Sequence, residues 1–158
     1  MSAVWTIESA GDDETIALGR RIGRAAGPGD VVAMVGELGS GKTRLAKGMA
    51  EGLGAAAAHD VASPTFVLCR EYTDGRIPFY HLDAYRLRGA ADLEAIGGDD
   101  ILGGDGLAAL EWADRTPEAL PSDHLAVRIE VTGEHTRRLS FEARGPGSQR
   151  LLDQVRTA

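Results

Sequence analysis

Residues 36–43 of the 158-residue chain read Gly-Glu-Leu-Gly-Ser-Gly-Lys-Thr, and these eight residues indicate its fold class. It matches the pattern G-x-x-x-x-G-K-[ST], in which glycines let consecutive backbone N–H groups converge on phosphate oxygens. The apolar run from Val31 to Val35 precedes it and predicts a buried strand, and Thr43 to Leu53 predicts an amphipathic helix that Gly54 ends. Strand, glycine loop and helix therefore occur in the order that a phosphate-binding loop requires.

The residues of this loop have separate predicted tasks. Lys42 would reach the β and γ phosphates of a nucleotide, and the Thr43 hydroxyl would bind the magnesium ion that bridges them. An ordinary glycine turn that caps a helix would not require the Lys-Thr pair, and the glycine spacing does not fit the G-x-G-x-x-G pattern of dinucleotide sites. The predicted cofactors are thus ATP and Mg²⁺, and the predicted nucleotide-binding residues of the loop are Leu38, Gly39, Ser40, Gly41, Lys42, Thr43 and Arg44.

Length and composition restrict the classes of protein that this chain can belong to. A chain of 158 residues fits one α/β domain, and 43% hydrophobic with 26% charged residues is near the average for a water-soluble protein. The amino terminus lacks a signal-peptide pattern, and the longest apolar runs fall well short of a membrane span, so we expect a cytoplasmic protein. The net charge of −7 opposes broad capture of nucleic acid, so a role in RNA chemistry would depend on a partner.

The remaining pattern predicts a single P-loop NTPase domain, α/β and three-layered, with a mixed central sheet flanked by helices. We place this domain at residues 1–144 and interpret residues 145–158, which begin with Gly, Pro and Ser, as a loose tail. The other expected elements are a first helix capped by Asp12 or Asp13, an antiparallel pair at 67–72 and 77–82 around Asp74-Gly75, a short helix at 91–96, a buried strand at 107–110, and a terminal strand pair at 125–131 and 137–144.

Hydrolysis of a bound nucleotide also needs an acidic group near the metal and the attacking water. Glu111 directly follows the apolar run 107–110, so it would project from the carboxyl end of a buried strand, where open α/β sheets bind ligands. His81, Asp83 and Tyr85 would share one face if their strand continues, because side chains alternate along a strand. An acid at a strand end is also often solvated or a helix cap, and both readings stay open for Asp83 and Glu111.

Two further segments have a functional and a structural interpretation. Thr65, in Ser63-Pro64-Thr65-Phe66, lies where many P-loop proteins sense the γ phosphate, although a proline turn before a strand would explain the same residues. Trp112 follows Glu111 and would either pack in the core or contact the nucleotide.

Four signatures together resemble one family, the bacterial TsaE (YjeE) ATPases of tRNA threonylcarbamoyladenosine biosynthesis. Residues 36–43 look like the family's G-[DE]-L-G-[AS]-G-K-T loop, and Ser63-Pro64-Thr65-Phe66 looks like its S-P-T-[FY] segment. Residues 81–87 are similar to its H-x-D-x-Y-R-L element, and Glu111-Trp112 is similar to its Glu-Trp pair. The resemblance covers roughly Asp12 to Pro121.

This resemblance implies an ATPase that supports the TsaD and TsaB proteins, which attach the threonylcarbamoyl group, and that meets tRNA only indirectly. It implies no membrane partner. By motif, Lys42 would bind phosphate, Thr43 and Glu111 would hold magnesium, and Asp83 would assist at the metal or the water. The implied catalytic residues are Lys42, Asp83 and Glu111, and the implied metal ligands are Thr43, Asp83 and Glu111.

The resemblance also implies contacts to the rest of the nucleotide. Thr65 would sense the nucleotide state, and Trp112 would shape the pocket. Residues at the start of the first helix, around Asp12 to Thr15, and a basic residue of the terminal strand pair, Arg137 or Arg138, would help to hold the nucleoside.

Two other functions remain compatible with a P-loop. A small metabolite kinase would need an acceptor pocket and an arginine-bearing lid, and apart from Arg86 and Arg88 the sequence offers no suitable basic cluster downstream. A nucleotide-dependent binding switch would bind without turnover, but the sequence lacks an Asn-Lys-x-Asp segment that would favour GTP.

Overall fold

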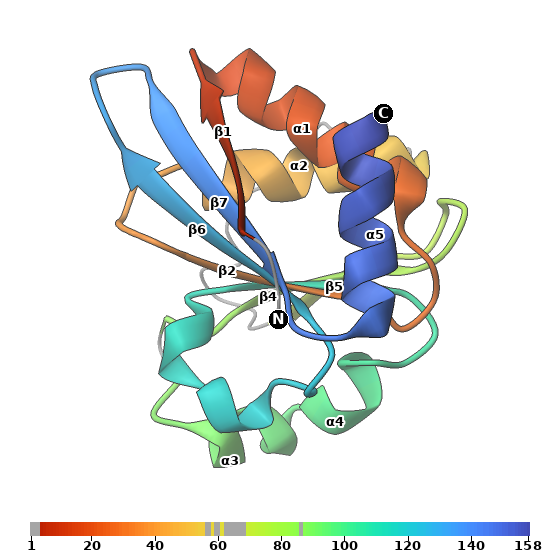
Figure 1. Ribbon diagram of the computed structural model, residues 1–158. Helices are drawn as coiled ribbons and strands as arrows, with labels where there is room; N and C mark the ends of the chain where they lie inside the picture. The colour runs from red at the N-terminus through yellow and green to blue at the C-terminus, as the bar shows by residue number, and fades with distance from the viewer. Residues whose placement is uncertain (1–3, 56–57, 59–60, 62–68, 86) are drawn as a thin grey trace.

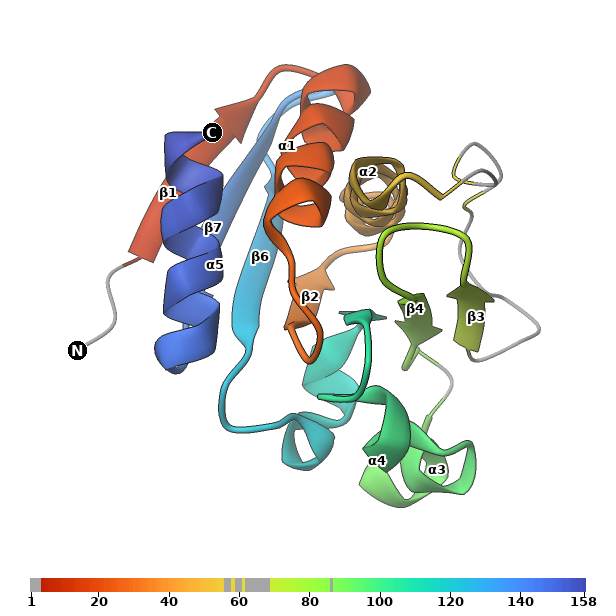
Figure 2. The same ribbon diagram turned by 90° about the vertical axis from the view of Figure 1, so that its right-hand side faces the viewer.

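A computed structural model gives the fold of the chain and describes residues 4–55, 58, 61, 69–85 and 87–158. A seven-stranded mixed sheet forms its centre, with helices on both faces (Figures 1 and 2). In chain order the elements are β1 (Val4–Ser9), α1 (Asp12–Ala25), β2 (Val31–Gly36), α2 (Lys42–Leu53), β3 (Cys69–Tyr72), β4 (Phe79–Asp83), α3 (Ala90–Ala95), α4 (Gly98–Ile101), β5 (Leu107–Glu111), η2 (Ala113–Arg115), η3 (Pro117–Ala119), β6 (Leu125–Val131), β7 (Arg137–Ala143) and α5 (Pro146–Thr157).

The order of the strands, β1-β7-β6-β2-β5-β4-β3, places β2 in the middle of the sheet. β2 pairs in parallel with β5 and β6, and β4 extends the parallel part next to β5. β1, β3 and β7 pair antiparallel with their neighbours, which makes the sheet mixed. The predicted α/β fold with a mixed central sheet is confirmed, and so are the hairpin formed by β3 and β4 and the pair formed by β6 and β7.

The sequence of β2 explains why this strand is central. Successive side chains of a strand point to opposite faces, so an unbroken apolar run suits a strand that is covered on both sides. Val32 and Met34 enter one hydrophobic cluster with α1, α2 and α5, whereas Val31 and Ala33 enter a second cluster on the other face of the sheet. The three layers predicted from the sequence are therefore present.

Helices α1 and α2 approach each other very closely, and glycines make this possible. A Cβ atom on Gly19 would lie 2.2 Å from the Leu45 carbonyl oxygen and 2.9 Å from the Cα atom of Gly48. Gly23 and Gly52 repeat the same contact one turn further along. This packing fixes the start of α1 beside the start of α2, where the glycine loop ends.

The prediction of a loose tail at residues 145–158 is wrong, because these residues form α5 and pack on the sheet (Figure 1). Leu151, Leu152 and Val155 are at most 1% exposed. Asp123, more than twenty residues earlier in the chain, accepts hydrogen bonds from the backbone N–H groups of Gly147 (2.7 Å) and Ser148 (2.9 Å) at the first turn of the helix. The Gly-Pro-Gly start is thus a helix start with Pro at its first turn.

Two local expectations also differ from the structure. Gly11 occupies the N-cap position of α1, so Asp12 and Asp13 lie inside the first turn, where their charge complements the helix dipole. β4 ends at Asp83 and does not continue to Tyr85. Within the described residues, no helix combines the length and the apolar character needed to cross a membrane.

Candidate nucleotide site

The candidate site lies at the carboxyl ends of the parallel strands, where open α/β sheets place their ligands. The loop of residues 37–41 follows β2 and leads into α2. Glu111 ends β5 beside Met34 of β2, and Asp83 ends β4 directly beside Glu111. The topology therefore brings together three segments that are distant from one another in the chain.

Lys42 is folded over its own loop. Its Nζ atom donates hydrogen bonds to the carbonyl oxygens of Gly36 (2.7 Å) and Glu37 (2.9 Å), and the side chain is buried. Burial lowers the pKa of the Lys42 ammonium, although the nearby carboxylates of Glu111 and Asp83 oppose this shift. A cation held at the loop in this way matches a phosphate-binding lysine.

Gly39 and Gly41 give the loop its shape, because their φ angles of 77° and 113° lie in the left-handed region that side chains disfavour. Gly36 is needed for a different reason: a Cβ atom there would lie 2.6 Å from Ser40 Oγ and 2.7 Å from the carbonyl oxygen of Ile129. Gly36 therefore lets the start of the loop lie tightly against β6, and Gly39 and Gly41 let the loop turn.

Thr43, Glu111 and His81 form a chain of hydrogen bonds. The Thr43 hydroxyl donates to the Glu111 carboxylate, whose oxygens lie 3.2 and 3.1 Å away. His81 Nε2 makes a short contact with Glu111 Oε2, and His81 is completely buried. The structure therefore brings the two predicted metal ligands Thr43 and Glu111 together, and it gives His81 the role of a partner that orients the carboxylate.

Asp83 lies next to this pair but faces a different partner. Its Oδ1 atom accepts a hydrogen bond of 2.8 Å from the backbone N–H of Tyr85, and the residue is 9% exposed. Because the chain turns after Asp83, Tyr85 is half exposed and its ring lies 4.9 Å from that of Trp112. Asp83 is thus held near Glu111, and whether it contacts a metal stays a prediction.

Trp112 forms a wall of the site beside Lys42. The Lys42 Nζ atom lies 4.0 Å from the centroid of the Trp112 ring, a distance suited to a cation–π contact. The backbone of Trp112 is left-handed (φ 58°), which is rare for a bulky residue and turns the chain sharply after Glu111. The predicted pocket-shaping position of Trp112 agrees with this arrangement.

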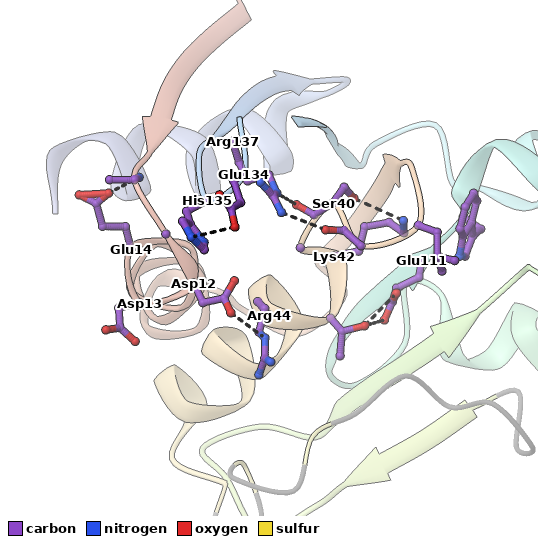
Figure 3. Close-up of a pocket in the computed structure, with 17 residues that line it drawn as sticks. Asp12, Asp13, Glu14, Ser40, Lys42, Arg44, Glu111, Glu134, His135 and Arg137 are labelled. Atoms are coloured by element: carbon purple, nitrogen blue, oxygen red, sulfur yellow. Dashed lines mark hydrogen bonds and ion pairs between the residues drawn. The ribbon is translucent and has the colours of Figure 1, made fainter. Parts of the chain in front are cut away.

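A pocket of about 870 Å³ opens in front of the loop (Figure 3). At the start of α1, Asp12 Oδ2 lies 3.5 Å from Nε of Arg44 in the first turn of α2, and both side chains are at least half exposed. Leu38, at the loop tip, is 86% exposed. The lining residues are Ala10, Gly11, Asp12, Asp13, Glu14, Leu38, Gly39, Ser40, Gly41, Lys42, Thr43, Arg44, Glu111, Trp112, Glu134, His135 and Arg137.

Glu134 and His135 were not found from the sequence; they come from the turn between β6 and β7. Asp13 and Glu14, in the first turn of α1, fall within the segment around Asp12 to Thr15 that the family resemblance indicated. The position of the turn depends on the pairing of β6 with β2, which no local pattern encodes. The close packing of α1 on α2 did have a sequence signal, since the spacing Gly-x-x-x-Gly occurs in both helices.

The two arginines of the terminal strand pair are separated by the structure. Arg137 lines the pocket and binds the glycine loop, whereas Arg138 pairs with Glu8 of β1 at 2.7 Å. The predictions for Thr65 and for the segment Ser63-Pro64-Thr65-Phe66 lie outside the described residues.

Taken together, the parallel strands, the glycine loop and the facing carboxylate define a nucleotide-binding protein of the P-loop class. A model of the family described as threonylcarbamoyl adenosine biosynthesis protein TsaE matches residues 9–139, further in both directions than the four motifs. The chain belongs to the TsaE family.

Individual relatives agree with this assignment. The Bacillus subtilis tRNA threonylcarbamoyladenosine biosynthesis protein TsaE is 38% identical over 143 residues, which cover 90% of this chain and 88% of the relative. The protein of the same name from Streptomyces coelicolor is 42% identical over 116 residues, covering 72% and 76% of the two chains. A crystal structure of Bacillus subtilis YdiB is 32% identical and superposes with a TM-score of 0.84 over 99% of this chain and 97% of that one.

Proposed function

We propose that this chain is a cytoplasmic ATPase that binds Mg-ATP in the pocket in front of the glycine loop and supports the modification of tRNA by a TsaD–TsaB complex. The observation that carries the proposal is the contact between the Thr43 hydroxyl and the Glu111 carboxylate, with the Lys42 ammonium beside them. P-loop NTPases hold magnesium between such a hydroxyl and an acid at a neighbouring strand end.

The oxygen atoms of this pair fit magnesium, which is a hard cation and prefers carboxylate, hydroxyl, water and phosphate oxygens. Among the described residues, no group of three or more His, Cys, Asp and Glu side chains could hold a metal alone. Thr43 and Glu111 would therefore share the ion with nucleotide phosphates and water, as is usual for magnesium. Bound magnesium would neutralise charge that develops on the phosphates.

The other side chains of the pocket would bind the remaining parts of the nucleotide and the attacking water. Lys42 would exchange its contacts with the Gly36 and Glu37 carbonyls for phosphate oxygens, and the loop N–H groups together with the start of α2 would bind the same phosphates. Asp83 would orient the attacking water or complete the metal site, and Thr65 would sense the nucleotide. Asp12 and Arg44 would contact the nucleoside end.

The partners follow from family membership and charge. Relatives of this chain are named as tRNA threonylcarbamoyladenosine biosynthesis proteins, so TsaD and TsaB are the expected partners. A net charge of −7 opposes direct capture of tRNA, and this supports an indirect role.

The test is ATP hydrolysis by the purified protein, alone and with its cognate TsaD and TsaB, beside the Lys42→Ala variant. We expect turnover that rises with the partners and is lost in the variant. ATP binding without turnover, in an otherwise active TsaD–TsaB preparation, would favour a binding switch. Transfer of the γ phosphate to a metabolite instead of water would favour a kinase.

A further inference from the structure

Arg137, the first residue of β7, connects two loops through its guanidinium group. Its Nε atom donates to the carbonyl oxygen of Ser40 (3.0 Å), and Nη2 donates to that of Gly39 (3.2 Å), so two donors hold the glycine loop. Nη1 donates to the carbonyl oxygens of Gly133 (3.1 Å) and Thr136 (2.8 Å) in the turn between β6 and β7. Figure 3 shows this guanidinium directed at the loop beside Ser40.

The topology of the sheet produces this connection. β6 runs parallel to β2, so the turn that follows β6 reaches the same edge of the sheet as the glycine loop that follows β2. A planar guanidinium carries several donors in a fixed arrangement, and it can therefore hold carbonyl groups of two loops at once. A lysine ammonium is a single point and lacks this geometry.

The contacts of Arg137 with the loop carbonyls also affect the orientation of the backbone N–H groups that would bind a phosphate. In a planar trans peptide the C=O and the following N–H point in opposite directions. When Arg137 holds the Ser40 carbonyl, the N–H of Gly41 is turned away from Arg137. By holding this carbonyl, Arg137 fixes the orientation of an N–H donor in the loop.

We propose that Arg137 is a positioning residue that preorganises the glycine loop for phosphate and couples it to the turn of residues 132–136. This inference rests on the proposed binding of nucleotide in the same pocket. The turn carries Glu134 and His135 into the pocket wall, so it becomes part of the nucleotide site. Because coupling between two sites is reciprocal, nucleotide bound at the loop also stabilises the turn.

Three variants test this proposal. Loss of two charge-assisted hydrogen bonds in Arg137→Ala is expected to weaken ADP binding about tenfold, and Arg137→Lys is expected to fall between this variant and the wild type. Arg138→Ala is the matched control, because Arg138 is the neighbouring residue of the same strand and pairs with Glu8 instead. Calorimetric titration with ADP gives the affinities, and circular dichroism with thermal unfolding verifies that each variant is folded.

Hydrogen–deuterium exchange separates positioning from a merely structural role. With ADP saturating each protein, exchange in residues 132–136 is expected to slow in the wild type and in Arg138→Ala, but not in Arg137→Ala. Equal slowing in Arg137→Ala, or ADP affinity equal to that of the wild type, would overturn the proposal. If the wild type itself does not bind ADP, the proposed function is wrong, and the inference that rests on it is wrong as well. If the wild type binds ADP and Arg137→Ala binds it equally well, only the inference is wrong.

Discussion

The two walls of the nucleotide pocket are built differently. On the loop side, Lys42, Thr43 and Glu111 contact one another or the loop backbone, and Lys42 and Glu111 are buried. On the opposite side, the Asp12 carboxylate is 69% exposed and meets the half-exposed Arg44 at 3.5 Å. The loop wall is thus preformed in the protein alone, whereas the opposite wall is open and acidic.

This difference indicates where binding energy for a nucleotide would come from. Buried, charge-assisted hydrogen bonds act at low local dielectric and are strong, whereas exposed ion pairs contribute little. We therefore expect the phosphates to be bound tightly and the nucleoside loosely by this chain alone. Substitutions in the two walls test this contrast.

Lys42→Ala removes the only side-chain cation that the motif assigns to the phosphates. Losing its charge-assisted hydrogen bonds is expected to weaken ATP binding by about 100-fold. Calorimetric titration with ATP measures this effect. Lys47→Ala, on the same helix but outside the pocket lining, is the control and is expected to bind as the wild type does. Similar affinities for the two variants would show that Lys42 does not contact phosphate.

Glu111→Gln keeps the size of the side chain and removes its negative charge. Turnover of Mg-ATP is expected to fall by about 100-fold, because the proposed magnesium site would lose its charged ligand. Binding of ADP without magnesium is expected to change little, since this step does not need the carboxylate. Steady-state hydrolysis across a range of magnesium concentrations measures the first effect, and titration with EDTA present measures the second.

The control for this substitution is Glu118→Gln, in the short helix η3. Undiminished hydrolysis by Glu111→Gln at saturating magnesium would assign Glu111 a structural role and make Asp83 the leading acid of the metal site.

Asp12→Ala tests the open wall and is expected to have the smallest effect. Its ion pair with Arg44 is exposed, and such pairs contribute about 1 kcal/mol or less, so the KM for ATP should change by less than about fivefold. Asp13→Ala, in the same helix turn, is the comparison. A larger loss in Asp12→Ala would mean that this wall contacts the nucleoside strongly, and the contrast between the walls would then disappear.

Local patterns were sufficient for the loop wall. The spacing of Gly36, Lys42 and Thr43 within eight residues predicts the shape of the loop backbone and a function for each of the two side chains. Glu111 was found because an apolar run ends directly before it. The alternation of side chains along a strand placed His81 and Asp83 on one face, and both residues lie beside Glu111.

Long-range contacts explain what the patterns did not reveal. Residues 145–158 look like a tail because their helix start is held by Asp123, which is distant in sequence. Arg137 appeared only as one of two arginines in a strand pair, since its place beside the loop depends on which strand lies next to β2. The small contribution to nucleotide binding that we expect from Asp12 follows from the exposure of its side chain. That exposure cannot be predicted from a single acidic residue in the sequence.

The P-loop, the buried strand before it, the helix after it and the acid that faces it could be predicted from the sequence, because each is encoded by residues that are close together in the chain. Three features became visible in the assembled fold: β6 lies beside β2, Arg137 reaches the carbonyls of the loop, and α5 covers the sheet. These features depend on pairings between distant segments, whose free energy comes from burial and hydrogen bonds that form only when the whole sheet is assembled.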